Sequence, residues 1–476
     1  MEDLLITYKI CHLCVGEEYL SKEIKNKGKR RKCSFCEITA STYDLQTLTD
    51  RIEDVLLNHF ERTASDPSSF EYSLMQDKES SYEWYREGQT TFDLLTNEFD
   101  INETAAGLIS ESLSSKYYDM DADIMGEETE FDEDVLYESK GISGERWVKD
   151  WSSFEETLKS EARFFSQNVN NILKSVFDGL DKFKTYRGRS VLTIIGPGHE
   201  IKSLFRARVF QSRSNLMEAL CTPDKLLGSP ASMYAMSGRM NARGISVFYG
   251  ATEEATAISE VRPPVGSKVA VAKFDLIKQL QLLDLRELAN VRELVSVFDP
   301  QYLEKMEKAS FLHTLGDMMT APVMPDDELF DYLPTQAIAE YLASQLDIQY
   351  DGIIYPSVQV EGGNKINIVL FYKAAKIKDI ILPPTTEVIA TDTEYTDEGE
   401  YPSYQVIEWI PSRTKKSNKG IDDKVSKDTR NPSLSIDTKS IHVHHIQSVT
   451  YTTESHPVGR TRMKKFNFPR NRDFDF

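Results

Sequence analysis

Four cysteines in the first 36 residues form the clearest chemical pattern of the chain. Their spacing is C-x2-C-x18-C-x2-C, and they are Cys11, Cys14, Cys33 and Cys36. A two-residue gap lets each pair grip one side of a tetrahedral ion, and four thiolates in a closed site suit structural Zn²⁺. The opening residues MEDLLITYKI lack the pattern of a secretion signal, which favours a metal over disulfides. We therefore expect a non-catalytic zinc knuckle over residues 1–41.

A second group of polar residues stands where strands are expected to end. LFRARVF places Arg206 and Arg208 on one face of a strand, and a guanidinium there could clamp a diphosphate. GRMNARGISVFYG runs from a Gly- and Asn-containing turn into a strand ending at Tyr249, and a short helix then carries Glu260. In YDGIIYPSVQV the proline predicts a bend that would aim the Ser357 hydroxyl into a cleft.

The elements that must position these groups read as a mixed α+β domain over residues 188–385. The predicted strands are rich in Val, Ile, Phe and Tyr, and they are SVLTII, SLFRARVF, ISVFYGA, KVAVAKFDL, YDGIIYPSVQV and KINIVLFY. Helical periodicity over 253–260, 301–312 and 335–346 lies between them. This alternation predicts strands with helices packed against their sheet.

The residues on either side of that domain differ from it. Residues 42–187 have helical periodicity, and 147–183 predict one long amphipathic helix or two joined end to end. The acidic stretch 119–134 is predicted to be a loop. Residues 386–476 are predicted to be a flexible linker and tail, within which SIHVHHIQSVTYTT should return to a sheet edge. His442 and His444 alternate with apolar residues there, which favours a strand over a metal site.

Charge and composition exclude several classes of function. The net charge is −20, and residues 50–140 hold 25 acidic against 6 basic residues, a net of −19. This argues against broad nucleic-acid binding. The acidic excess fits either a solvated surface or docking of a basic partner, and the basic run KNKGKRRK fits a solvated loop better than a nucleic-acid contact. No apolar run reaches about 18 residues, so we expect a cytoplasmic protein without a membrane span.

Taken together, the polar residues resemble the RES domain. The shared order is an arginine on an early strand, G-R-x-N before a strand ending in tyrosine, a glutamate eleven residues later, and a serine after DGIIYP. The resemblance implies a fold similar to ADP-ribosyltransferases, and several RES proteins are toxins that degrade NAD and are paired with an antitoxin. The helical front end resembles the HEPN-related region that precedes some RES domains. It lacks an R-x4-6-H ribonuclease motif, because seven residues separate Arg51 and His59.

The resemblance implies a role for each polar residue. Glu260 would stabilise the positive charge that develops on the ribose as its bond to nicotinamide breaks. Arg206 would hold the diphosphate, with Arg208 as the alternative if the strand register differs by two. Tyr249 would stack on nicotinamide or adenine, and Ser357 would bond the ribose or a phosphate. Taken singly, each residue would also fit a surface ion pair, a core position or a turn.

Arg239 and Asn241 would line the phosphate path on the same resemblance. NAD⁺ is then the substrate, and water, phosphate or a macromolecule is the acceptor. We therefore expect an NAD⁺ glycohydrolase or phosphorylase that acts as a regulated bacterial toxin or defence effector. An antitoxin or another regulatory protein would be its partner, and a homo-oligomer is possible. The alternatives are an ADP-ribosyltransferase and a non-enzymatic zinc-ribbon adaptor.

Overall fold

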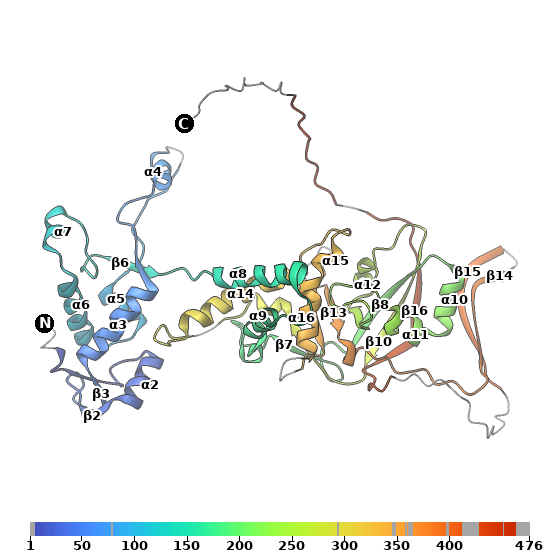
Figure 1. Cartoon of the computed structure of the whole chain (residues 1–476), viewed down its shortest axis with the longest axis horizontal. Helices are drawn as coiled ribbons and strands as arrows, with labels where there is room; N and C mark the ends of the chain where they lie inside the picture. Colours follow the sequence, from blue (N-terminus) through green and yellow to red (C-terminus); the bar gives the residue numbers. More distant parts are fainter. Residues whose placement is uncertain are drawn as a thin grey trace, which may run out of the picture.

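The structure is a computed structural model of the chain, and it describes residues 5–77, 80–292, 295–344, 349–357, 359, 365–396, 399–411, 428–450 and 452–462. Figure 1 shows an elongated molecule with the N-terminal elements at one end, the large sheet toward the other, and α8 (Glu145–Glu156) and α14 (Tyr302–Thr320) between them. The predicted α+β class is confirmed, with a cysteine cluster, a helical middle and an eight-stranded sheet. No described helix is long and apolar enough to cross a membrane.

A small antiparallel sheet in the order β1-β3-β2 brings the two cysteine pairs together. Its elements are β1 (Lys9–Cys11), β2 (Lys29–Lys32) and β3 (Thr39–Asp44), with α2 (Glu18–Lys27) between the first two strands. Cys11 ends β1 opposite Thr42, and Cys33 directly follows β2. Leu20 and Ile24 of α2 are buried in the core beside the sheet.

The next elements share one hydrophobic core with that small sheet and α2. They are α3 (Leu45–His59), β4 (Phe60–Arg62), α4 (Ser69–Gln76), β5 (Gln89–Thr90), α5 (Thr91–Asp93), η1 (Leu94–Glu98), α6 (Glu103–Tyr117), α7 (Met120–Met125) and β6 (Leu136–Ser139). One face of α3 is buried, including Leu48, Ile52 and Leu56. The prediction that 119–134 is a loop is wrong in part, since α7 lies there. Its caps are local, with Asp119 accepting from the Asp121 amide and Gly126 at φ +73°.

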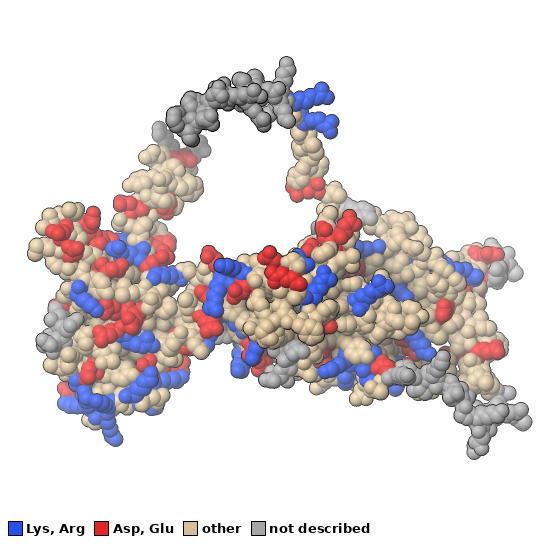
Figure 2. Space-filling model, viewed as in Figure 1, with Lys and Arg blue, Asp and Glu red and all other residues tan. Residues whose placement is uncertain are grey.

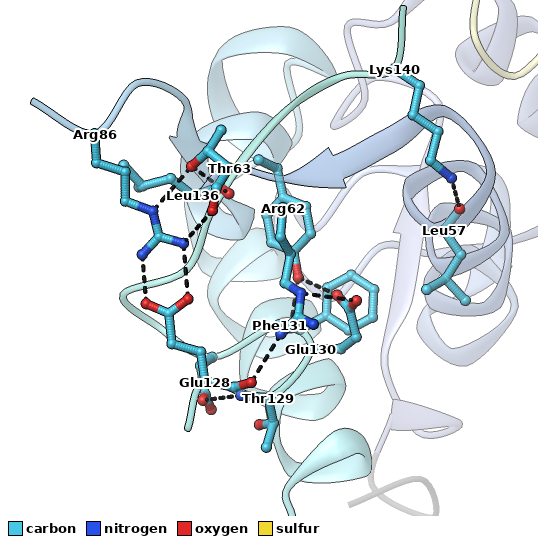
Figure 3. A network of polar contacts seen from close by, with 12 residues as sticks. Leu57, Arg62, Thr63, Arg86, Glu128, Thr129, Glu130, Phe131, Leu136 and Lys140 are labelled. Atoms are coloured by element: carbon cyan, nitrogen blue, oxygen red, sulfur yellow. Dashed lines mark hydrogen bonds and ion pairs between the residues drawn. The ribbon is translucent and has the colours of Figure 1, made fainter. Parts of the chain in front are cut away.

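Arginines tie the acidic stretch to the small sheet β4-β6-β5 (Figure 3). Arg86 donates to both carboxylate oxygens of Glu128 at 2.5 and 2.9 Å, and to the carbonyl oxygen of Thr63 at 2.9 Å. Arg62 lies 3.3 Å from Glu130. The hydrogen bond from Arg86 holds the pKa of Glu128 below its ordinary value. The scarce basic residues of this acidic segment therefore serve as internal ties.

Replacing Arg86 with methionine should lower the free energy of unfolding at pH 7 by about 0.5–1 kcal/mol, as for a solvent-screened pair. The pKa of Glu128 is lowered in the folded state, so the stabilisation is present above the ordinary carboxyl pKa and is lost as pH falls through the folded value. Urea unfolding at pH 7 and at about pH 3 measures this. Lys22→Met, which removes an exposed pair with Glu18, should change little, and an Arg86→Met effect independent of pH would contradict the assignment.

Helices α8 and α9 (Gln167–Phe177) pack with the large C-terminal sheet and not with α3 and α6. They are two helices, as one of the predicted alternatives had it, and the segments η2 (Thr157–Glu161) and η3 (Leu180–Lys182) follow them. Trp147 and Trp151 of α8 lie 5.9 and 5.6 Å from the ring of Phe311 on α14. The same core contains residues of β11, β12 and α16.

The eight-stranded sheet has the order β16-β10-β8-β9-β13-β12-β11-β7 and is antiparallel except for β11 with β12. Its strands are β7 (Leu192–Ile195), β8 (Ser203–Phe210), β9 (Phe248–Ala251), β10 (Lys268–Leu276), β11 (Leu280–Asp284), β12 (Gly352–Pro356), β13 (Ile366–Leu370) and β16 (Leu434–His445). The prediction that the late segment returns to a sheet edge is confirmed for its first six residues, because β16 pairs with β10. The strand begins before the predicted run and ends at His445.

Helices cover this sheet, and a ribbon extends from it. The helices are α10 (Arg213–Cys221), α11 (Pro223–Leu226), η4 (Ser232–Tyr234), α12 (Glu254–Glu260), α13 (Leu285–Leu288), α15 (Glu328–Asp331), α16 (Leu333–Ser344) and η5 (Tyr372–Ala374). The predicted helices correspond to α12, α14 and α16. Residues 386–411 are not linker, since they form the ribbon β14 (Glu387–Thr396) and β15 (Gly399–Trp409), which α10 contacts. The predicted linker at 412–427 and the tail beyond 462 lie outside the described residues.

One phenylalanine from the C-terminal half is buried in the N-terminal core. Phe298, just before α14, is 1% exposed, and its ring lies 4.9 Å from that of Phe99. Arg51 of α3 donates to the carbonyl oxygen of Phe298 at 2.6 Å, and His59 meets Tyr302 edge-on at 4.9 Å. The start of α14 is therefore anchored in the N-terminal half.

Phe298→Ala should lower the free energy of unfolding of the N-terminal core by about 3–5 kcal/mol, because it leaves a cavity among aromatic side chains. Urea unfolding combined with limited proteolysis of the junction before α14 measures the effect. Phe330→Ala is the control, because Phe330 is 55% exposed and should cost less than about 0.5 kcal/mol. Equal stability of the two variants would show that Phe298 does not anchor α14.

Candidate active site

A cavity of about 430 Å³ lies where the middle of the sheet meets α12 and the end of α14. Four residues predicted from the sequence line it, and they are Arg206, Arg239, Tyr249 and Glu260. Side chains that the sequence did not single out complete the wall, among them Thr320, Tyr332, Tyr355 and Asn367. Predicted residues from β8, from the turn before β9, from β9 and from α12 therefore converge on one site.

Arg206 brings an enclosed positive charge to this cavity. It projects from β8, lies over the ring of Phe248 at 5.2 Å, and donates from Nη1 to the carbonyl oxygen of Tyr249 at 2.9 Å. Its Nε is buried and has no hydrogen-bond partner in the part of the chain that the structure describes. Burial, with a smaller effect of Arg208, lowers the pKa of Arg206 to about 10, so it stays cationic at neutral pH. Such a group is suited to an anionic ligand.

Glu260 is held by two side chains that arrive from the other side of the cavity. Ser357 donates to Glu260 Oε1 at 2.6 Å, and Asn367 Nδ2 donates to the same oxygen at 2.7 Å. Glu260 is the last residue of α12, so its side chain leaves the helix at the cavity wall. Both hydrogen bonds end on one oxygen, which leaves Oε2 without a described partner and available to a ligand.

Tyr249 organises the turn that precedes its strand. Its hydroxyl donates to Asn241 Oδ1 at 2.8 Å and accepts from the Met240 amide at 3.0 Å. Gly238 allows this approach, because a Cβ there would come within 2.8 Å of both Asn241 Oδ1 and the Tyr249 hydroxyl. The pKa of Tyr249 is raised by burial. Its ring is thus fixed at the cavity wall by its own hydroxyl.

Arg239 links the same turn to the end of α14. Its Nη1 donates to the carbonyl oxygens of Met319 and Ala321 at 3.2 and 2.9 Å, and its guanidinium lies 5.1 Å from the ring centroid of Tyr332. A cation is favoured at a helix C-terminus, where carbonyl groups lack helical partners. Arg239 therefore fixes the end of α14 beside the cavity.

Two family models match the chain. A RES domain matches residues 214–393, and a HEPN/RES N-terminal domain 1 matches residues 26–172. The chain carries a RES domain behind a HEPN/RES N-terminal domain. This assignment indicates an NAD-related enzyme. No curated protein and no solved structure matches the chain significantly.

The matched ranges and the packing do not coincide. Arg206 on β8 precedes the matched part of the RES domain, yet it hydrogen-bonds β9 within it, and β16 also lies beyond the match. The N-terminal match includes α8 and the first half of α9, which pack on the RES core. The two domains of this chain are therefore interlocked.

Three other predicted residues, Ser357, Arg208 and Asn241, do not line the cavity. Ser357 acts on it only through its hydrogen bond to Glu260. Arg208 is exposed and donates to the carbonyl oxygen of Leu226, so it serves the link from β8 to α11. The amide of Asn241 is buried and donates to the carbonyl oxygens of Met236, Ala242 and Ile245. Asn241 instead borders a larger hollow of about 1090 Å³ beside α9 and α16. None of Arg206, Arg239, Tyr249 and Glu260 lines this hollow. Asn241 shapes the turn beneath Tyr249.

Sequence reasoning missed the residues that complete the RES cavity. Asn367 is 2% exposed within the apolar strand β13, and a lone amide among Ile and Val residues was a detectable signal. Tyr355 sits in the quoted run DGIIYP, and burial raises its pKa well above the ordinary value. Tyr332 and Thr320 come from segments whose sequence carries no such signal, because only the packing of α14 and α15 brings them to the site.

The four cysteines converge as their spacing predicts. The sulfur atoms of Cys11 and Cys36 lie 3.4 Å apart, and Cys14 Sγ lies 3.8 Å from both Cys11 Sγ and Cys33 Sγ. Zn–S bonds of about 2.3 Å in a tetrahedron place sulfurs roughly 3.8 Å apart. Burial raises the pKa of Cys11 and of Cys14. Burial also acts on Cys33, but backbone hydrogen bonds from Cys36, Phe35 and Cys11 outweigh it and lower the pKa of Cys33 to about 7. The cluster can therefore hold a metal ion.

Arg51 and His59 have structural partners that account for them. Both contact the segment that leads into α14, as described above. Burial and the charge of Lys140 lower the pKa of His59, which favours the neutral ring at neutral pH. These contacts agree with the absence of a ribonuclease motif in this part of the sequence.

Compounds that contain a diphosphate should stabilise the RES domain through Arg206. We expect ADP-ribose to raise the thermal midpoint of the wild type and adenosine to leave it unchanged, because only the former brings an anion to the enclosed guanidinium. Arg206→Met should lose this shift while retaining or gaining stability without ligand, since an enclosed charge is replaced by an apolar chain. Arg208→Met is the control and should keep the shift. An undiminished ADP-ribose shift in Arg206→Met would exclude this role.

Proposed function

We propose that this protein breaks the nicotinamide–ribose bond of NAD⁺, as a glycohydrolase or phosphorylase. The observation that carries the proposal is the meeting of an enclosed cation and a held carboxylate in one cavity. Arg206 would bind the diphosphate, and Glu260 would face the ribose next to nicotinamide. The RES assignment supports NAD as the substrate class.

The proposed reaction begins with loss of nicotinamide. The C1′–N1 bond breaks, and nicotinamide leaves with the electron pair as a neutral molecule. Positive charge then develops on the ribose ring, and the carboxylate of Glu260 stabilises it. An oxygen of water or of inorganic phosphate bonds to C1′, and water loses a proton in the process. The products are nicotinamide with ADP-ribose or its 1″-phosphate.

Ser357 and Asn367 act in this scheme as positioning residues. Their hydrogen bonds to Glu260 Oε1 orient the carboxylate and leave Oε2 for the ribose. Tyr249 and Tyr355 provide aromatic surface at the cavity wall, against which the nicotinamide or adenine ring would stack. Arg239 is close enough to line the phosphate path, but its carbonyl contacts give it a structural role as well.

The N-terminal half is proposed to regulate this activity. Residues 1–41 would hold a structural Zn²⁺, and residues 42–187 would restrain or assemble the catalytic domain at residues 188–385. This regulation would take place in the cytoplasm, together with an antitoxin or a similar partner. The burial of Phe298 and the packing of α8 on the RES core support such a link. A toxin or defence effector needs control of this kind, because uncontrolled NAD loss would stop the growth of its own cell.

Nicotinamide release from NAD⁺ tests the proposed reaction. The wild type should release nicotinamide in buffer or phosphate, and Glu260→Gln should reduce the rate on the order of 10²–10³-fold with an unchanged thermal midpoint. Glu253→Gln, on the exposed residue that precedes α12, should keep wild-type activity. Ser357→Ala should fall between the two, with a loss of about 10-fold.

Other results would redirect or reject the proposal. Transfer of labelled ADP-ribose to a protein or nucleic acid, without release of free ADP-ribose, would assign the protein as a transferase. Absence of nicotinamide release by the wild type under all these conditions, with Glu260→Gln indistinguishable from it in cells, would favour a non-enzymatic adaptor.

The zinc proposal predicts one tightly bound Zn²⁺ per cysteine cluster. Cys14→Ser should lose it, and a strong chelator should unfold the β1-β3-β2 sheet, because binding of a structural zinc ion is coupled to folding. Metal analysis and circular dichroism measure the two effects. Cys221→Ser is the control, since Cys221 lies outside the cluster. Purified wild type without zinc but with this sheet intact would contradict the proposal.

A further inference from the structure

A second group of metal-ligating side chains lies on the catalytic sheet, away from the cysteine cluster. It consists of Glu254, His442 and His444, whose ligand atoms all lie within 4.8 Å of one another. None of the three lines the candidate active site. The strand pattern alone had suggested that these histidines belong to a plain edge strand, and their packing requires a different interpretation.

Strand geometry brings the two histidines to one face. They are two residues apart on β16, where His442 pairs with Val271 and His444 with Val269 of β10. Both valines pack in the small core under α12, together with Ala257 of that helix. The histidine rings therefore project on the side of the sheet that α12 covers, which is where Glu254 begins this helix.

The three side chains meet at one carboxylate oxygen. Glu254 Oε1 lies 2.7 Å from His444 Nε2 and 3.2 Å from His442 Nδ1. The group therefore consists of one carboxylate with two imidazole nitrogens directed at the same oxygen.

This donor set is that of a borderline divalent ion. Two imidazole nitrogens and one carboxylate oxygen bind ions such as Zn²⁺, Ni²⁺ or Cu²⁺ with bonds of about 2.0–2.2 Å. The side chains of Glu254, His444 and His442 are 30%, 37% and 64% exposed, so the remaining coordination positions would open to solvent. An ion between these atoms, which are now in hydrogen-bond contact, requires the two rings to turn outward.

We propose that Glu254, His442 and His444 form a second metal site, which takes a borderline divalent transition-metal ion and joins β16 to α12. The ion would complete its coordination with water. It differs from the closed cysteine cluster in having open coordination positions. It also links Glu254 to His442 and His444, which follow it in the sequence by 188 and 190 positions.

The site acts on the helix that carries Glu260. Helix α12 has seven residues, with Glu254 at its first position and Glu260 at its last. So short a helix is unstable alone, so contacts at its ends determine how it is held. An ion at Glu254 would fix the start of α12 to the sheet, while Ser357 and Asn367 hold the residue at its end.

Ni²⁺ titration of the full chain tests the site. The protein is used without a histidine tag and with zinc in its cysteines, and calorimetry should show one Ni²⁺ bound per chain. His442→Ala and His444→Ala should each weaken binding by at least about 100-fold, more than the loss of an outer-sphere partner. With Cu²⁺, electron paramagnetic resonance should show two coupled imidazole nitrogens in the wild type and one in each variant.

Matched histidines serve as controls. His445 lies next to His444 but bonds the Tyr404 hydroxyl of β15, and His456 is exposed beside Glu454. His445→Ala and His456→Ala should bind Ni²⁺ like the wild type, and all four variants should keep its thermal midpoint in the absence of added metal. Equal Ni²⁺ affinity in His442→Ala, His444→Ala and the wild type, or no Ni²⁺ bound at all, would overturn the proposal.

A second measurement connects the ion to α12 and remains separate from the proposed NAD reaction. Hydrogen exchange of the α12 amides should slow when Ni²⁺ is added to the wild type and should not change in His444→Ala. This readout needs no substrate, so it can succeed even if NAD⁺ is not cleaved. Exchange in α12 that is unaffected by bound Ni²⁺ would exclude the link between the ion and the helix.

Discussion

A guanidinium group enclosed in protein has to be stabilised by its surroundings, and Arg206 imposes this requirement on the centre of the catalytic sheet. Desolvation of a charge costs free energy unless hydrogen bonds or an opposite charge offset it. Here the described partners are one carbonyl oxygen, that of Tyr249, and the face of Phe248. Strands β8 and β9 pair only between Phe205 and Ala251, so Arg206 lies where the two strands diverge.

The other side of the cavity depends on α12, which is too short to be stable without tertiary contacts. Ala257 packs on Ala207, Val269 and Val271, and this contact sets the height of the helix above the sheet. Its two ends are then held by polar groups from β16, β12 and β13. The position of Glu260 therefore depends on strands that are remote in sequence but adjacent in the fold.

The N-terminal half reaches the same cavity through α14. The helix starts beside Phe298, which is buried in the N-terminal core, and it ends at Thr320 in the cavity wall, where Arg239 holds its last carbonyl groups. Figure 1 shows α14 and α8 side by side between the two ends of the molecule. Figure 2 shows acidic and basic side chains interspersed over this face, with basic residues gathered near α2 and β2. Any shift of the N-terminal core that moves Phe298 must move α14 or break its packing on α8.

The sequence by itself determined those features that depend on the spacing of residues close together in the chain. The cysteine pairs are close in sequence and join through a short sheet, so their meeting followed from their number and gaps. The order of Arg206, Tyr249, Glu260 and Ser357 was enough to indicate the RES domain, because each stands in a short, recognisable run of the sequence. The periodicity of apolar residues predicted helices α3, α12 and α16, since each of them turns one apolar face toward a hydrophobic core.

Only the tertiary structure decided which side chains meet. Glu260 bonds Ser357 and Asn367 across 97 and 107 residues, and Glu254 meets His444 across 190. Arg206 and Arg208 share a strand and a residue type, yet only Arg206 lines the cavity. The reason is physical: sequence periodicity specifies which face of an element is apolar, whereas the partner of a polar group is set by which strands become neighbours in the sheet.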